Sequence, residues 1–111
     1  MKIEILVFDG CPNREPAEKL VSETVNEAGV DADIELVKVR DSEDAVAKRF
    51  LGSPSIRING KDIEVEENEF THYSMRCRVY RSGDRYSGVP PKDLLVSAVS
   101  DALESPRRTP Q

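Results

Sequence analysis

Hydrophobic and polar positions in the first part of the chain predict a strand, a helix and a second strand. Residues 3–8 form an almost unbroken apolar run, as expected for a central strand that is covered on both faces. Residues 33–39 alternate between apolar and charged side chains, so the second strand has one solvated face or lies at an edge. Between them, apolar residues recur at helical spacing up to Gly29, which is placed to end the helix. Such a βαβ unit has a right-handed crossover and parallel strands.

A shorter helix is predicted after the second strand. Asp41 or Ser42 is placed to cap its first turn, because short polar side chains accept hydrogen bonds from free backbone N–H groups. Val46 and Phe50, and with them Ala47, are expected to point inward. We expect this helix to end before the next strand begins.

The following strand is predicted to belong to an antiparallel hairpin. Residues 55–58 alternate, and the Asn59-Gly60 pair after them is the strongest short-range signal of a hairpin turn. The returning strand stays open, because residues 61–65 and residues 76–80 both alternate. We favour residues 76–80, which makes the acidic stretch between the two a surface insertion.

A third helix is predicted near the end of the chain. The Pro90-Pro91 pair suits its first turn, and apolar residues then recur at helical spacing. These residues are Leu94, Leu95, Ala98, Val99, Ala102 and Leu103. We expect one domain over residues 1–104 and a disordered tail over residues 105–111, which has no periodic pattern.

Composition and charge narrow the classes of protein. A chain of 111 residues with 38% hydrophobic and 33% charged residues fits one small globular domain. Its 16 Lys and Arg against 21 Asp and Glu give a net charge of -5, which argues against nucleic-acid binding. No apolar run approaches the roughly 20 residues that cross a bilayer, and the chain opens directly into a strand instead of a signal peptide. We expect a cytoplasmic protein that binds neither nucleic acid nor a membrane, and its oligomeric state stays open.

Two cysteines and one histidine limit the chemistry. Cys11 and Cys77 are better interpreted as thiols than as a structural disulfide, because we expect no export signal. A closed zinc site needs four ligands, usually Cys or His, and with His72 the chain offers three. Zinc sites and Ser/His hydrolase chemistry are therefore disfavoured.

The Cys11-Pro12 pair stands where the first predicted strand meets the first predicted helix, and Pro54 comes immediately before the third strand. This arrangement resembles the thioredoxin/glutaredoxin fold: residues 8–14 resemble its Cys-Pro-x-x active-site segment, and residues 52–55 resemble its loop with a cis proline. The resemblance implies an α/β, thioredoxin-like fold with a four-stranded mixed sheet in the order 2-1-3-4 and three helices, two on one face and one on the other. The chain also resembles small bacterial thioredoxin-like proteins, some of which carry alkylmercury-lyase labels, although no residue spacing here points to carbon–mercury cleavage.

A cysteine at the start of a helix has an electrostatic reason. Free N–H groups and about half a positive charge at a helix N-terminus favour the thiolate, which is the attacking species. Pro54 would hold Ser53 extended, so that the backbone of Ser53 could pair with a bound thiol-containing peptide as an added strand does. Cys11 is therefore the candidate nucleophile, and Pro12, Asn13, Ser53 and Pro54 are candidate substrate contacts.

Two positions depart from the pattern of a dithiol oxidoreductase. Arg14 stands where the second cysteine would be, so no disulfide can form within this segment and dithiol exchange by the usual route is excluded. Pro16 fits a helix that starts after Asn13, because proline lacks the N–H that a later turn needs. Cys11 then lies just outside the first turn, where Arg14 adds positive potential and is a further candidate substrate contact.

Four arginines follow the acidic stretch: Arg76, Arg78, Arg81 and Arg85. A solvated face or an intramolecular charge match is the simpler interpretation, and recognition of an anionic ligand such as the carboxylates of glutathione is the sharper one. On the favoured topology Arg81 lies nearest the active end of the sheet. Cys77, beside Val79 on an alternating strand, is most simply a buried apolar thiol. The acidic residues 62–69 are most simply a solubilising surface.

These observations support three hypotheses of function. In the first, the protein is a single-cysteine thiol-disulfide oxidoreductase or thiol carrier, in which Cys11 attacks a disulfide and an external thiol resolves the intermediate. It needs no bound cofactor, and its partners are proteins or low-molecular-weight thiols and disulfides, with glutathione as a possible co-substrate. The second is a binding module that uses the same loop without turnover, and the third is capture of a soft metal, Hg(II) or Cu(I), by Cys11 either alone or with Cys77. Against all three stands an unreactive Cys11 that fills a turn.

Overall fold

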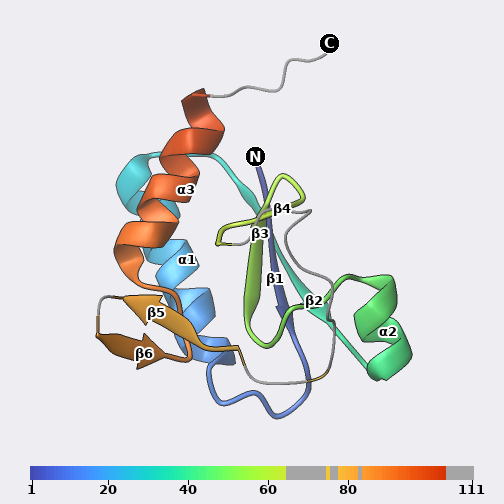
Figure 1. The fold of residues 1–111 in the computed structure, drawn as a ribbon. Helices are drawn as coiled ribbons and strands as arrows, with labels where there is room; N and C mark the ends of the chain where they lie inside the picture. Colours follow the sequence, from blue (N-terminus) through green and yellow to red (C-terminus); the bar gives the residue numbers. More distant parts are fainter. Residues whose placement is uncertain (65–74, 76–77, 83, 105–111) are drawn as a thin grey trace.

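The computed structural model describes residues 1–64, 75, 78–82 and 84–104. Four strands form a mixed sheet in the order β2-β1-β3-β4, which is the predicted order (Figure 1). They are β1 (Lys2–Val7), β2 (Asp33–Lys38), β3 (Ser55–Ile58) and β4 (Lys61–Asp62). A second sheet pairs β5 (Tyr80–Ser82) with β6 (Arg85–Ser87). The tail predicted over residues 105–111 lies outside the described residues.

The first strand is central in the main sheet, as its apolar run predicts. β1 pairs in parallel with β2, Ile3 opposite Ile34, and antiparallel with β3 on its other side. Ile3, Ile5 and Leu6 are at most 1% exposed, because helices cover both faces of the strand. The parallel βαβ unit and the edge position of β2 are both confirmed.

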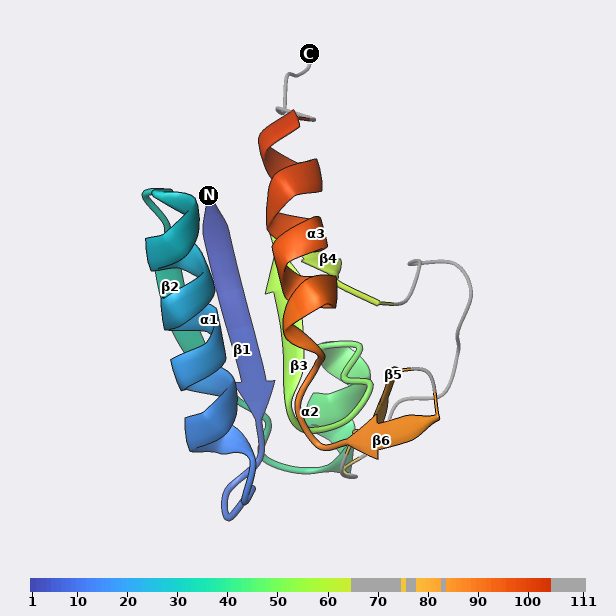
Figure 2. The ribbon, with the colours of Figure 1, turned by 90° about the vertical axis from the view of Figure 1, so that its left-hand side faces the viewer.

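The three helices divide between the two faces of the main sheet (Figure 2). α1 (Arg14–Ala28) and α3 (Lys92–Glu104) lie side by side on one face, where they pack on Ile3 and Ile5. α2 (Ser42–Ala47) covers Leu6 on the opposite face. Two helices on one face and one on the other is the predicted arrangement.

The second helix is capped as predicted, and Phe50 is buried as predicted, but Val46 and Ala47 are not. The Asp41 side chain accepts a hydrogen bond from a backbone N–H of the first turn, at 2.8 Å. Val46 is 60% exposed and Ala47 is exposed, so the prediction that they point inward is wrong. The helix ends at Ala47, and beyond its end the Phe50 N–H donates a hydrogen bond to the Ala45 carbonyl. Ala45 and Phe50 therefore fill this side of the core.

The hairpin after β3 is confirmed, and it decides the returning strand. Asn59 and Gly60 have φ of 54° and 86°, the positive values that a two-residue turn of this kind requires. The turn places Lys61 directly opposite Ile58. β4 is therefore the short strand that follows at once, and the preference for residues 76–80 is wrong. A local closure costs less chain entropy than a return from much further along the chain.

Residues 78–80 have their polar side chains inward. Residues 76–77 lie outside the described residues, whereas Arg78 and Tyr80 are 6% and 1% exposed. Val79 between them is 59% exposed, contrary to the expectation that this face is the buried one. Tyr80 begins β5, which pairs with β6 and not with the main sheet. The alternation is present, but hydrogen-bonding partners hold the polar side chains inside.

The last helix begins after the proline pair, as predicted. The Pro91 carbonyl accepts hydrogen bonds from the first turn, and Leu95 and Val99 are buried. Leu103, which was expected on the buried stripe, is 53% exposed, because the last turn of α3 extends past the strands (Figure 2). Among the described residues, no helix has the length and apolar character that a membrane crossing requires.

Candidate functional site

Cys11 lies in the connection between β1 and α1. Its N–H donates to the Phe8 carbonyl at 3.3 Å, and its carbonyl accepts from the Arg14 N–H at 3.4 Å. α1 begins at Arg14, directly after Asn13, so the late helix start predicted from Pro16 is confirmed. Cys11 is 9% exposed and packs against the main core, which leaves only a small part of the residue open to solvent.

The residues that follow Cys11 differ in exposure and in the groups they contact. Pro12 is exposed and Asn13 is half-buried, and the Asn13 side chain makes no capping hydrogen bond. A Cβ on Gly88 would overlap the Asn13 side chain, so the connection between β6 and α3 packs directly against this turn. Arg14 is about half-exposed and pairs with Glu18 at 3.7 Å along the helix. The Arg14 charge is thus shared with a carboxylate one turn away.

The Pro54 loop (residues 52–55) reaches the same end of the sheet. Leu6 pairs with Ser55 in the antiparallel register, so Pro54 lies beside the end of β1, from which the chain leaves toward Cys11 (Figure 1). The Ser53–Pro54 peptide bond is cis. Ser53 is fully buried, and its hydroxyl has no hydrogen-bond partner among the described residues. The hydrogen bonds of this loop are therefore made by its backbone and by the Ser55 hydroxyl, and not by the Ser53 side chain.

The cover segment (residues 78–80) packs along the Pro54 loop. The Arg78 N–H donates to the Ser53 carbonyl at 2.9 Å, and the Tyr80 hydroxyl donates to the Pro54 carbonyl at 2.8 Å. A Cβ on Gly52, whose φ is 132°, would lie 2.9 Å from the Cβ of Arg78. Two segments far apart in the sequence are in direct contact here.

A buried ion pair holds the cover segment to β4. The Arg78 guanidinium donates to both carboxylate oxygens of Asp62 at 2.6 and 2.9 Å, and it also reaches Glu64 at 3.2 Å and the Ser55 hydroxyl at 3.1 Å. Its carbon Cζ lies 4.6 Å from the centre of the Tyr80 ring. Burial by itself would lower the pKa of Arg78, but hydrogen bonds to Asp62 raise it overall. Burial raises the pKa of the Tyr80 phenol, so both groups keep their protons.

This arrangement is not predicted by the sequence pattern. Of the candidate interpretations of the arginines, the intramolecular charge match holds for Arg78, whereas the solubilising surface is wrong for Asp62, whose side chain is 8% exposed. Arg81 lies in β5 opposite Tyr86, on the separate two-stranded sheet. The available signal was the shared alternation of Arg78 and Tyr80, which marks one face without saying that it is the inner one.

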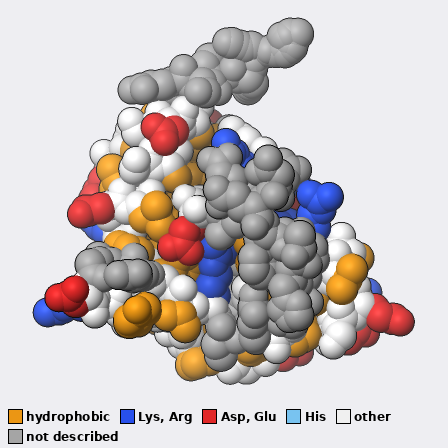
Figure 3. Space-filling model, in the orientation of Figure 1, with side chains coloured by type: hydrophobic (Ala, Val, Ile, Leu, Met, Phe, Trp, Pro, Cys, Tyr) orange, Lys and Arg blue, Asp and Glu red, His pale blue; other side chains and the backbone are white. Residues whose placement is uncertain are grey.

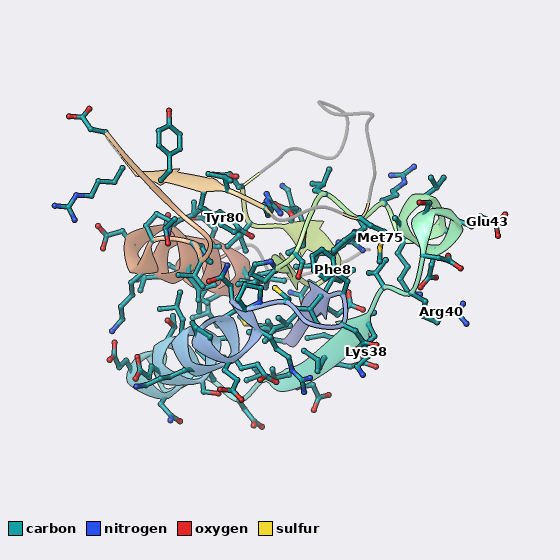
Figure 4. The ribbon with its side chains drawn as sticks, turned by 90° about the horizontal axis from the view of Figure 1, so that it is seen from below. Phe8, Lys38, Arg40, Glu43, Met75 and Tyr80 are labelled. Carbon is teal, nitrogen blue, oxygen red and sulfur yellow. The ribbon has the colours of Figure 1, made fainter. Side chains whose placement is uncertain are left out.

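A shallow hollow of about 410 Å³ lies on the other side of this end of the sheet. Phe8 and Met75 supply apolar lining, while Lys38 and Arg40 supply cations (Figure 4). Val39 adds a further apolar side chain. Figure 4 shows Tyr80 toward β5, away from Lys38 and Arg40. Lys38 pairs with Asp9 at 2.9 Å, and Arg40 pairs with Asp44 at 3.4 Å. Neighbouring carboxylates therefore balance the two positive charges at the rim of the hollow.

Two residues that were counted as candidate metal ligands lie outside the described residues. They are Cys77 and His72, so the separation between Cys77 and Cys11 is not described. Within the part of the chain that the structure describes, no group of three or more His, Cys, Asp or Glu residues could hold a metal ion. Cys11 is the only cysteine among the described residues.

The chain belongs to the thioredoxin-domain family. The family model matches residues 1–65, which is more than half of the chain and includes both Cys11 and the Pro54 loop. Comparison with the curated proteins and with the solved structures gives no match. Membership of this family supports a redox or thiol-related function at the family level. The matched stretch stops before the cover segment.

Proposed function

We propose that the protein is a single-cysteine thiol-disulfide oxidoreductase or thiol carrier that acts through Cys11. The observation that carries the proposal is the placement of this thiol: it lies between the end of β1 and the start of α1, at the end of the sheet that the Pro54 loop also reaches. Backbone N–H groups at the start of a helix stabilise a nearby thiolate. Membership of the thioredoxin-domain family supports the same class of chemistry.

The proposed reaction needs two thiol–disulfide exchanges. The Cys11 thiolate attacks one sulfur of a disulfide RSSR′, forms the mixed disulfide Cys11–S–S–R, and releases R′S⁻, which takes up a proton. An external thiol R″SH then loses its proton and attacks the R sulfur, which forms RSSR″ and returns the Cys11 thiolate. The second sulfur must come from outside this segment, because Arg14 occupies the position of a resolving cysteine.

Single-residue variants of the full chain test this proposal. The protein is incubated with a mixed disulfide of glutathione and a small thiol, with glutathione as the external thiol, and the oxidised glutathione formed is followed with time. We expect Cys11→Ser to abolish the catalysed part of the rate, because the hydroxyl is not a nucleophile toward disulfides at neutral pH.

Cys77→Ser is the matched control, and we expect it to keep the catalysed rate. An equal loss in both variants would favour a two-thiol site over a single-cysteine one. A catalysed rate that survives in Cys11→Ser would contradict the proposal, and a Cys11→Ser variant that still binds a partner protein would favour the binding module.

A further inference from the structure

The Pro54 loop has hydrogen bonds to the protein itself on three successive carbonyls. The Gly52 carbonyl accepts from the Ser55 hydroxyl at 2.6 Å, the Ser53 carbonyl from the Arg78 N–H at 2.9 Å, and the Pro54 carbonyl from the Tyr80 hydroxyl at 2.8 Å. All four residues of the loop are buried. The carbonyls that a bound peptide would pair with are thus already engaged.

The cover segment also fills the space beside the loop. Neighbouring strands in a sheet lie about 4.8 Å apart. The cover segment already stands in that neighbouring position, because Arg78 lies directly beside Gly52. A Cβ on Gly52 would already be 3.1 Å from the Cα of Arg78. An extended peptide could add a strand here only after the cover segment had moved away.

The cover segment is firmly held. Arg78 is fixed by the buried carboxylate of Asp62, and Tyr80 is 1% exposed beneath it. Removing one partner of a buried ion pair is strongly unfavourable, so displacing Arg78 from Asp62 to admit a peptide would be costly. A substrate that needs no pairing with the Pro54 loop avoids this cost.

We infer that Cys11 exchanges with low-molecular-weight disulfides and not with extended polypeptides, because the cover segment occupies the backbone of the Pro54 loop. This inference rests on the proposed function and names its substrate class. The small open part of Cys11, 9% of the residue, agrees with access by small molecules. The expectation that the Ser53 backbone pairs with a peptide is replaced by its pairing with Arg78.

Two probes with the same leaving group test the inference. One is the mixed disulfide of thionitrobenzoate with N-acetylcysteine amide, and the other is the mixed disulfide of thionitrobenzoate with a ten-residue extended peptide that has one central cysteine. The Cys11 thiolate forms a disulfide with the cysteine sulfur and releases coloured thionitrobenzoate. The Cys77→Ser chain is used so that only Cys11 reports, and each rate is divided by the rate of free glutathione with the same probe.

We expect the normalised rate with the peptide to be about tenfold lower than with the single amino acid, whereas strand addition would supply binding energy and raise it. Tyr80→Phe removes the hydroxyl that holds the Pro54 carbonyl and keeps the ring. We expect it to raise the peptide rate by about two- to tenfold, the net effect of one hydrogen bond, and to leave the small-probe rate unchanged. The matched control is Tyr86→Phe, on the neighbouring strand with a tyrosine that is 67% exposed, and we expect it to change neither rate.

A peptide rate equal to or above the small-probe rate would overturn the inference while leaving the proposed function standing. Release from neither probe would overturn both. A Tyr80→Phe variant that slows both probes equally would also overturn the inference, because it would give Tyr80 a general structural role. Retention of the small-probe rate with a selective gain for the peptide supports it.

Discussion

At the scale of single residues, Asp44 forms ion pairs with Arg40 and Lys48. Its side chain is 7% exposed and accepts hydrogen bonds from the Lys48 ammonium and from the Arg40 N–H. These bonds lower the pKa of Asp44 from 3.8 to about 2, with Lys48 the larger cause. The carboxylate form is therefore favoured by folding.

This pKa shift gives a signed prediction for acid unfolding. Because the pKa of Asp44 is lower in the folded state, its contribution to stability is fully present above pH 4 and is lost as the pH falls through about 2. We expect Asp44→Asn to lower the free energy of unfolding in urea at pH 6, and the difference from the wild type to shrink steadily below pH 4. Asp31→Asn, at an exposed aspartate, is the control and should show no such trend. A difference that stays constant down to pH 2 would contradict the assignment.

The residues of the candidate site were predictable where local chemistry defines them. Cys11 and Pro54 stand out because a cysteine after a strand and a proline before one have few structural alternatives. Tyr80 did not stand out, because its role depends on a carbonyl 26 positions earlier in the chain. A hydrogen bond across that separation leaves no periodic trace in the sequence.

At the scale of elements, the Arg78–Asp62 pair fastens the cover segment to β4. The two side chains are 5% and 8% exposed, so removal of one charge leaves the other buried with weakened compensation. We expect Asp62→Asn to lower the free energy of unfolding by about 3 kcal/mol, measured by urea titration. Lys92→Ala breaks an ion pair with Glu27 between side chains that are 43% and 61% exposed, and it should cost much less. Equal effects of the two variants would contradict the proposed anchor.

The elements that the sequence predicts correctly are those that short-range patterns define. The βαβ unit and the hairpin after β3 follow from short-range patterns, since period and turn chemistry act within a few residues. The return of residues 78–80 to the Pro54 loop does not, because an alternating pattern does not identify its partner strand. Polar faces of strands usually point to solvent, but Arg78 is buried, so the polar face of this segment points inward. Val46 and Leu103 were misplaced for a related reason: helical spacing gives a face, but not where the helix ends.

At the scale of the whole molecule, the candidate site lies at one end of the main sheet. The connection that carries Cys11 and the Pro54 loop both lie there, while α1 and α3 cover one face and α2 the other (Figures 1 and 2). Hydrophobic side chains remain exposed around β5, β6 and α3 (Figure 3), among them Tyr86 and Val96. This end of the sheet thus combines the Cys11 thiol with a loop whose carbonyls accept hydrogen bonds from the protein itself.

Peptide mapping by mass spectrometry tests most directly whether the native thiol reacts. The folded protein is exposed to bis(2-hydroxyethyl) disulfide, digested under acid conditions that block further exchange, and examined for a mercaptoethanol adduct on each cysteine. We expect an adduct on Cys11 that an added thiol removes and that Cys11→Ser lacks. An unmodified Cys11 in the folded protein, with an adduct only after denaturation, would contradict it.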